Sequence, residues 1–281
     1  MEKLAPLSDY VLSPEQLALY LRRIGLDAMA DGADRGELPP ADAATLTALQ
    51  RAHLQTVPFE CLDIAAGRLP LDLSLDGLFR KIVTRRRGGI CYEQNLLYAA
   101  VLQALGYAVS LRAARHPKYG DDFDHIFLQV DIPGEAHPFL ADVGFAVNFS
   151  VPLLLATGVV QDDGRNRYEL REEPAAGEGY GRLWLQPGLE GPGEWSEVFT
   201  FGPLSYQTND YLERCHWYCT DERSRFVQGP MISIDGPEGR KTLSARHFIV
   251  TAGGERTSVD VESPEQYEAY LRDEFGLEGV S

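Results

Sequence analysis

The sequence has no run of apolar residues that approaches the roughly 20 needed to cross a membrane. Its opening residues, MEKLAPLSDY, are too polar for the core of a signal peptide. Basic residues are scarce, because 26 Lys and Arg stand against 42 Asp and Glu and give a formal net charge of −16. Since nucleic-acid binding depends on a basic surface, we expect a cytoplasmic protein with no nucleic-acid partner and no membrane partner.

Positive charge is concentrated at Arg85, Arg86 and Arg87. A local cluster of this kind can attract an anionic small molecule even when the whole protein is acidic. A solvated loop is the plainer interpretation of three consecutive arginines.

Cysteine is also rare, with four in 281 residues, so the sequence does not predict a framework of disulfides. Cys215 and Cys219, with His216 between them, resemble one half of a zinc site. No second pair of ligands stands nearby at a zinc-site spacing, and we therefore expect no bound metal. The two thiols are interpreted as buried or partly exposed groups on an irregular segment.

Helical patterns dominate the chain up to about residue 106. Ser13 and Ser263 each begin the same four residues, Ser-Pro-Glu-Gln, which predict a helix N-cap followed by proline in the first turn. The first of these helices is expected to end at Gly25 and the second at Gly276. Further helices are predicted at residues 40–56 and near 75–82.

The pattern changes after residue 106 to short stretches that alternate or run apolar, separated by Pro and Gly. The clearest predicted strands are residues 107–113, 125–132 and 139–145. Short strands and the closing helix are mixed in the last part of the chain. This order predicts an α+β fold in three lobes, divided as 1–106, 107–205 and 206–281.

Cys91 follows two glycines and precedes a stretch with helical spacing that Gly106 ends. This places the cysteine in or just before a first helical turn, where free backbone N–H groups and the helix dipole favour a thiolate. The thiolate is the nucleophilic form, so Cys91 is a candidate nucleophile. A small buried apolar residue is the alternative interpretation. Glu93 and Asn95, which follow closely, are given structural roles.

A cysteine nucleophile needs a base, and the base needs a group that orients it. A hairpin centred near residues 133–134 would place His125 opposite Asp142, and a slip of one residue would reverse the face. A buried aspartate is costly without a partner, and a histidine would be one. We therefore interpret His125 as the base and Asp142 as its orienting group.

Spacing alone leaves other residues open for both roles. The alternative bases are His53, His116, His137, His216 and His247. Asp122 or Asp124 could take the place of Asp142.

Three separated motifs resemble the arylamine N-acetyltransferase family. The segment Arg-Gly-Gly-Ile-Cys-Tyr-Glu-Gln-Asn around Cys91 matches the most specific of them, and the strand with His125 and the run Asp-Val-Gly-Phe at residues 142–145 follow in order. Residues 57–60 and 20–25 also fit, so the resemblance covers nearly the whole chain.

The resemblance implies a helical lobe, a β-barrel lobe and an α/β lid, with a cysteine-protease-like Cys-His-Asp site between the first two. It implies transfer of an acyl group, usually acetyl from coenzyme A, through a thioester on Cys91 to an arylamine or hydrazine. His125 would be the base and Asp142 its orienting group. The coenzyme A thioester is a co-substrate, and no tightly bound cofactor is expected. Substrate contacts are expected at Tyr92, Phe145, Phe59 and Gly144.

Three features depart from the family. Cys61 stands where Asn is common, and Ala146 stands where Gly is common, so that an added methyl would alter how the coenzyme's pyrophosphate is held. The segment between Cys91 and His125 is several residues shorter than is typical, which would open the acyl pocket. These changes leave an alternative, an amide synthase of natural-product biosynthesis that takes a longer acyl chain from an acyl carrier protein and forms a macrolactam or other amide. A cysteine hydrolase and a non-catalytic binding module are further alternatives.

Overall fold

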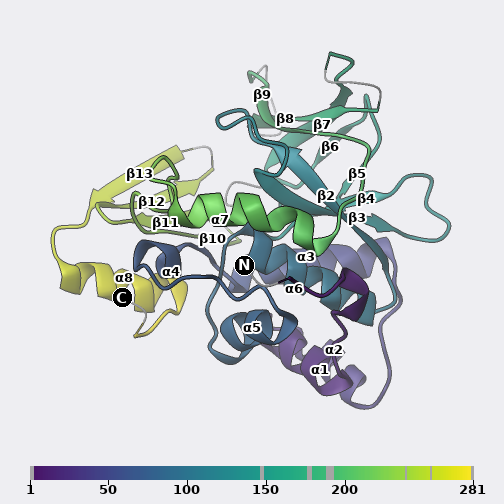
Figure 1. Ribbon diagram of the computed structural model, residues 1–281, viewed down its shortest axis with the longest axis horizontal. Helices are drawn as coiled ribbons and strands as arrows, with labels where there is room; N and C mark the ends of the chain where they lie inside the picture. Colours follow the sequence, from purple (N-terminus) through teal and green to yellow (C-terminus); the bar gives the residue numbers. More distant parts are fainter. Residues whose placement is uncertain are drawn as a thin grey trace.

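The computed structural model describes residues 3–145, 149–175, 179–187, 193–237, 239–253 and 255–279. Helices form most of the N-terminal part (Figure 1). They are α1 Pro14–Arg23, α2 Asp27–Asp34, α3 Ala43–Thr56, α4 Leu62–Ala65, α5 Leu75–Phe79 and α6 Cys91–Ala104. A 3-10 turn at Leu7–Asp9 precedes them, and a π-helical turn at Arg80–Thr84 continues α5.

The two predicted helix starts are confirmed. The Ser13 hydroxyl accepts a hydrogen bond from the Gln16 N–H at 3.1 Å, and the Gln16 side chain accepts one from the Ser13 N–H at 2.9 Å. Ser263 caps helix α8, Pro264–Phe275, and Gly276 ends that helix with a left-handed φ of 64°.

Helix α6 is the buried centre of the N-terminal part. Every residue from Cys91 to Leu102 is buried, because α6 packs against α1, α5 and two strands of the neighbouring sheet. A helix that is covered on all sides needs no polar face, and its buried polar side chains Glu93, Gln94 and Asn95 all form hydrogen bonds.

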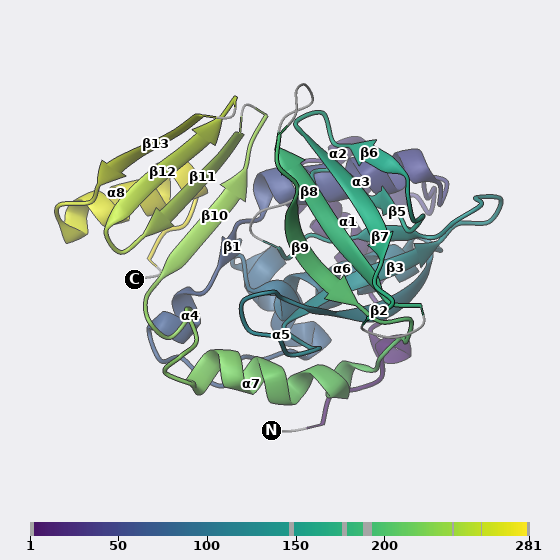
Figure 2. The same cartoon turned by 90° about the horizontal axis from the view of Figure 1, so that it is seen from above.

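Eight antiparallel strands form one sheet that curls into a nearly closed barrel (Figures 1 and 2). They are β2 Ala108–Arg115, β3 His125–Asp131, β4 Phe139–Ala141, β5 Leu153–Leu154, β6 Val160–Asp162, β7 Asn166–Glu172, β8 Gly181–Pro187 and β9 Ser196–Phe201. Their order in the sheet is β5-β4-β3-β2-β9-β8-β7-β6. The Gln161 side chain joins the two ends of this sheet, because it accepts from the Leu154 N–H at 2.6 Å and donates to the Leu154 carbonyl at 2.9 Å.

The hairpin of β3 and β4 has a register two residues away from the predicted one. Leu128 pairs with Ala141, so the register would continue His125 to Gly144 rather than to Asp142. Strand β4 ends at Ala141, and Asp142 lies directly after it. Because side chains alternate with a period of two, this shift keeps each of them on its predicted face.

The C-terminal part contains a second antiparallel sheet with α8 packed against it (Figure 2). Its strands are β10 Met231–Asp235, β11 Gly239–Ser244, β12 His247–Ala252, β13 Glu255–Asp260 and, from the N-terminal part, β1 Phe59–Glu60. The pairing of β1 with β10 joins this sheet to the helices. The predicted boundaries after residues 106 and 205 fall between α6 and β2 and beyond β9, and the division into three lobes stays a prediction.

Helix α7, Leu212–Thr220, follows a 3-10 turn at Thr208–Tyr211. Tyr211 and Tyr218 contact the ring of Tyr92. The prediction that Cys215 and Cys219 lie on an irregular segment is wrong, because both lie on α7, and their spacing of four residues places them on one buried face.

The described part of the chain contains no group of three or more His, Cys, Asp or Glu side chains that could hold a metal ion. Within the same residues, no helix is both long and apolar enough to span a membrane.

Candidate active site

Cys91 is the first residue of α6, as its sequence context predicts. The two glycines before it are needed for close packing. A Cβ on Gly88 would lie 1.8 Å from the Pro58 carbonyl oxygen, and a Cβ on Gly89 would lie 2.7 Å from a carboxylate oxygen of Glu93. That same Glu93 oxygen accepts the Ile90 N–H at 3.0 Å, so the first turn of α6 is held against the preceding segment.

Cys91, His125 and Asp142 form a continuous line of contacts. His125 Nε2 lies 2.7 Å from Asp142 Oδ2, and the Cys91 thiol is close enough to the imidazole to raise its pKa. The three residues are buried, with exposed fractions of 5%, 2% and 0%. Burial lowers the pKa of His125, but the charge of Asp142 and the bonds to Asp142 and Cys91 outweigh it and raise the pKa to about 10. The imidazolium form is therefore favoured at neutral pH.

Asn95, which the sequence analysis gave a structural role, and Gln50, which it did not single out, hold Asp142 in place. The Asn95 amide donates to Asp142 Oδ1 at 2.8 Å and to the Ile126 carbonyl at 2.7 Å. Gln50 accepts the Asp142 N–H at 3.0 Å. Asn95 lies four residues after Cys91 on α6, so helical spacing could have placed it beside the nucleophile. Gln50 comes from α3, and no local pattern marks it.

The other histidines are engaged or distant from this line of contacts. His53 is fully buried between the Tyr20 hydroxyl at 2.6 Å and the Gln94 amide oxygen at 2.9 Å, and burial lowers its pKa to about 3. His116 is half-buried, with its ring 6.2 Å from that of Phe145. His137, His216 and His247 are exposed.

The alternative aspartates are also occupied elsewhere. Asp122 pairs with Arg115 at the surface, with oxygen and nitrogen 2.6 Å apart. Asp124 is buried, and its carboxylate accepts hydrogen bonds from Arg214 on α7 and from the Tyr218 hydroxyl. Within the described residues, the aspartate that bonds His125 is Asp142.

The four predicted substrate residues differ in their surroundings. The Phe145 ring lies 4.7 Å from the His125 ring, and a Cβ on Gly144 would lie 2.6 Å from Cys91 Cα. Tyr92 is fully buried and donates its hydroxyl to the Phe123 carbonyl at 2.7 Å. Phe59 is buried on β1 with its ring 5.8 Å from that of Phe226. A substrate contact at any of the four stays a prediction.

Comparisons with known proteins agree over most of the chain. The N-acetyltransferase family model matches residues 42–280. The arylamine N-acetyltransferase of Mycolicibacterium smegmatis is 33% identical over 92% of this chain and 90% of its own length, and that of Escherichia coli is 30% identical over 83% and 82%. This chain belongs to the N-acetyltransferase family.

Solved structures of relatives give the same result. The M. smegmatis arylamine N-acetyltransferase superposes with a TM-score of 0.82 at 31% identity, covering 93% of this chain and 92% of that one. The Mycobacterium marinum arylamine N-acetyltransferase in complex with CoA superposes with a TM-score of 0.81 at 30% identity, covering 92% of each chain. The predicted resemblance, the α+β fold with its barrel and the assignment as an acyltransferase are confirmed.

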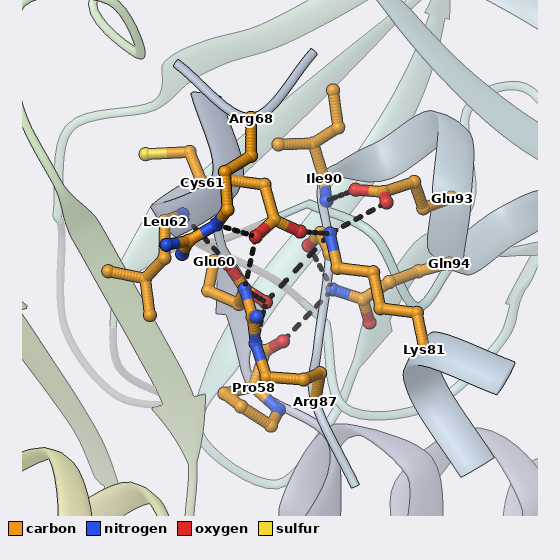
Figure 3. Close-up of polar contacts among 12 residues, drawn as sticks. Pro58, Glu60, Cys61, Leu62, Arg68, Lys81, Arg87, Ile90, Glu93 and Gln94 are labelled. Carbon is orange, nitrogen blue, oxygen red and sulfur yellow. Dashed lines mark hydrogen bonds and ion pairs between the residues drawn. The ribbon is translucent and has the colours of Figure 1, made fainter. Parts of the chain in front are cut away.

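In this N-acetyltransferase a buried network of charges holds the segment that precedes Cys91 (Figure 3). Glu60 on β1 is fully buried and lies 2.8 Å from Arg87, while Lys81 lies 2.7 Å from Glu93 and 2.9 Å from Asp63. Burial lowers the pKa of Lys81, but the surrounding carboxylates outweigh it and raise the pKa above its usual value. The interpretation of the three arginines as a solvated loop is therefore wrong for Arg87, which is buried because β1 and α4 supply two carboxylates to it.

The first departure from the family, Cys61, packs in the hydrophobic core. Cys61 is 1% exposed, and its sulfur lies 3.6 Å from the Met231 carbonyl oxygen, so it belongs to the contact between α4 and β10. Ala146 lies outside the described residues. The predicted effect of the short segment between Cys91 and His125 on the acyl pocket stays a prediction.

Proposed function

We propose that this chain moves an acetyl group from acetyl-CoA through a thioester on Cys91 to the nitrogen of an arylamine or hydrazine. The observation that carries the proposal is the contact of the His125 imidazole with both Cys91 and Asp142. The relatives support the substrates, because they are named arylamine N-acetyltransferases and one of them was solved in complex with CoA.

The first half of the reaction forms the acyl-enzyme. The raised pKa of His125 favours a thiolate on Cys91 beside an imidazolium. The thiolate attacks the carbonyl carbon of the thioester, and the bond from that carbon to the coenzyme's sulfur breaks. The departing sulfur takes the proton from His125 and leaves as the free thiol. Backbone N–H groups in the first turn of α6 stabilise the oxyanion, at roughly 2.7–4 kcal/mol for each donor.

The second half transfers the acetyl group. The amine nitrogen attacks the carbonyl carbon, neutral His125 takes a proton from that nitrogen, and the Cys91 thiolate leaves. Asp142 stabilises the imidazolium that forms, and Asn95 and Gln50 keep Asp142 oriented. The burial of Cys91 and His125 limits the access of water, which favours transfer to an amine over hydrolysis.

Release of coenzyme A separates this proposal from its alternatives. With acetyl-CoA, we expect wild type to release the free thiol rapidly when 4-anisidine or hydralazine is present, slowly without it, and Cys91→Ala to release none. Equal release with and without amine would identify a hydrolase. Release from a long-chain acyl thioester but not from acetyl-CoA would contradict the acetyl donor and favour the amide synthase.

A further inference from the structure

A cavity lies at one end of the barrel, separate from the line of contacts at Cys91. Its volume is about 660 Å³, and it opens to solvent at exposed Glu172. Its other walls include Arg112, Gln129, Leu155, Leu170 and Phe201. Gln129 follows His125 and Phe127 on the inner face of β3, so the cavity lies further along the barrel than the active site. The rings of Phe199 and Phe127 lie between them, since Phe199 is 5.8 Å from His125 and Phe127 is 5.1 Å from Phe201.

Arg112 supplies a buried positive charge to this cavity. It is 8% exposed and points to the inside of the barrel, because it pairs with Phe127 on β3. Its guanidinium donates to the side-chain oxygen of Gln129 and to the Gly202 carbonyl, and its carbon lies 5.7 Å from the centre of the Phe201 ring.

The guanidinium has unused capacity for an anion. Of its five N–H donors, the buried Nε has no hydrogen-bond partner. Within the described residues no carboxylate forms an ion pair with Arg112. Burial lowers its pKa, and Tyr211, Tyr206 and the more distant carboxylate of Asp131 offset this only in part. Arginine nevertheless stays charged at neutral pH.

The cavity fits one class of ligand better than others. A carboxylate presents two oxygens in the geometry that a guanidinium matches, and one negative charge balances one arginine. Leu155, Leu170 and Phe201 form apolar walls for the rest of the molecule, and the volume lies within the roughly 300–1,000 Å³ range of small-molecule sites. Exposed Glu172 in the wall disfavours a dianion such as a phosphate monoester. We propose that the barrel binds a small organic monocarboxylate, with its carboxylate on Arg112 and an aromatic or branched body against these walls.

Calorimetric titration of wild type with 4-phenylbutyrate tests the proposal, with 4-phenylbutyramide as the neutral analogue and phenyl phosphate as the dianion. We expect saturable binding of the acid, and binding of the amide and of the phosphate that is weaker by roughly tenfold or more. Equal affinity for acid and amide, tighter binding of the phosphate, or no saturable binding of the acid would overturn it. Displacement of the acid by saturating 4-anisidine would place it at the catalytic site and would also overturn it.

Two substitutions with opposite expected effects on the affinity for the acid test the position of the site. Arg112→Gln should weaken binding of the acid by roughly tenfold or more, while Glu172→Gln should strengthen it by about two- to threefold because it removes a repulsive charge. Glu15→Gln, which makes the same change in net charge on distant α1, should leave the affinity unchanged. Glu172 is exposed, so its replacement leaves the fold intact and keeps the test valid even where Arg112→Gln fails to fold. Equal affinity of Glu172→Gln and Glu15→Gln would contradict the proposed position.

Discussion

At the scale of single residues, the His125 imidazole lies between the carboxylate of Asp142 and the thiol of Cys91. Asp142 holds one side of the ring at 2.7 Å, and the folded state raises the pKa of His125 to about 10. The pKa of a histidine in an unfolded chain is about 6.5. The folded protein therefore binds the imidazolium proton more tightly than the unfolded chain does, and the bond contributes stability only while the proton is present.

The contribution of His125 to the free energy of unfolding should decrease as the pH rises. It is complete below about pH 6.5, declines as the pH rises, and is lost above about pH 10. The free energy of unfolding of wild type should thus fall between pH 7 and pH 10, measured by urea denaturation. His125→Gln, which has no titrating ring, should show a smaller decrease. Equal decreases in the two proteins would contradict the raised pKa.

The close packing around Gly144 leads to a second prediction at this scale. A Cβ there would lie 2.6 Å from Cys91 Cα and 2.8 Å from the Asn95 amide nitrogen, so Gly144→Ala must displace the nucleophile or its supporting amide. We expect kcat/KM for acetyl transfer to fall by about 100-fold or more, since small misplacements of reacting groups cost that much. Gly229→Ala is the matched control, because a Cβ there meets no atom within 4 Å. Equal activity of the two variants would show that close packing at Gly144 is not needed.

At the scale of elements, the start of α6 is tied to β1 and to the π-helical turn by buried charges. Lys81 is 14% exposed and faces the carboxylates of Glu93 and Asp63. Removal of one partner from a buried network leaves the others uncompensated, which typically costs about 3–5 kcal/mol.

Lys81→Met should therefore lower the free energy of unfolding by about 3 kcal/mol or more in urea denaturation. Lys241→Met provides the comparison, because Lys241 pairs with Glu274 at the surface with its side chain 46% exposed. That substitution should cost less than about 1 kcal/mol. A similar cost for both would mean that burial does not decide the strength of this network.

Elements with strong local signals could be predicted from the sequence, and those that depend on distant partners could not. The caps at Ser13 and Ser263 and the cysteine at the start of α6 follow from neighbouring residues alone. Strand β1 has two residues and exists because β10, far along the chain, pairs with it. Helix α7 was not predicted, because its Cys-His-Trp-Tyr-Cys run was considered as a set of metal ligands and not for the helical spacing of its buried residues.

The same distinction holds within the candidate site. Cys91, His125 and Asp142 could be named from motifs, although the hairpin register was off by two residues. Gln50 could not be named, because its contact with Asp142 depends on how α3 packs beside the loop after β4. The register error had no effect on the site, since an even shift preserves the faces of both strands.

At the scale of the whole molecule, the barrel is closed by a side chain and not only by strand pairing. Gln161 on β6 makes two hydrogen bonds with the Leu154 backbone on β5, across the ends of the sheet. Gln161→Leu should lower the free energy of unfolding by about 1–3 kcal/mol, because it leaves two backbone groups without partners. Gln228→Leu, which removes a single exposed side-chain bond to the Glu222 carbonyl, is the control and should cost less. Equal stability of the two variants would argue against this closure.

The central claim is that Cys91 carries the acyl group, and mass spectrometry of the intact protein tests it most directly. After brief exposure to acetyl-CoA, wild type should gain the mass of one acetyl group, and 4-anisidine should remove it. Cys91→Ser should gain no acetyl group that 4-anisidine removes at a comparable rate. Acetylation of wild type and Cys91→Ser to the same extent, or turnover without any acetylated intermediate, would contradict the account.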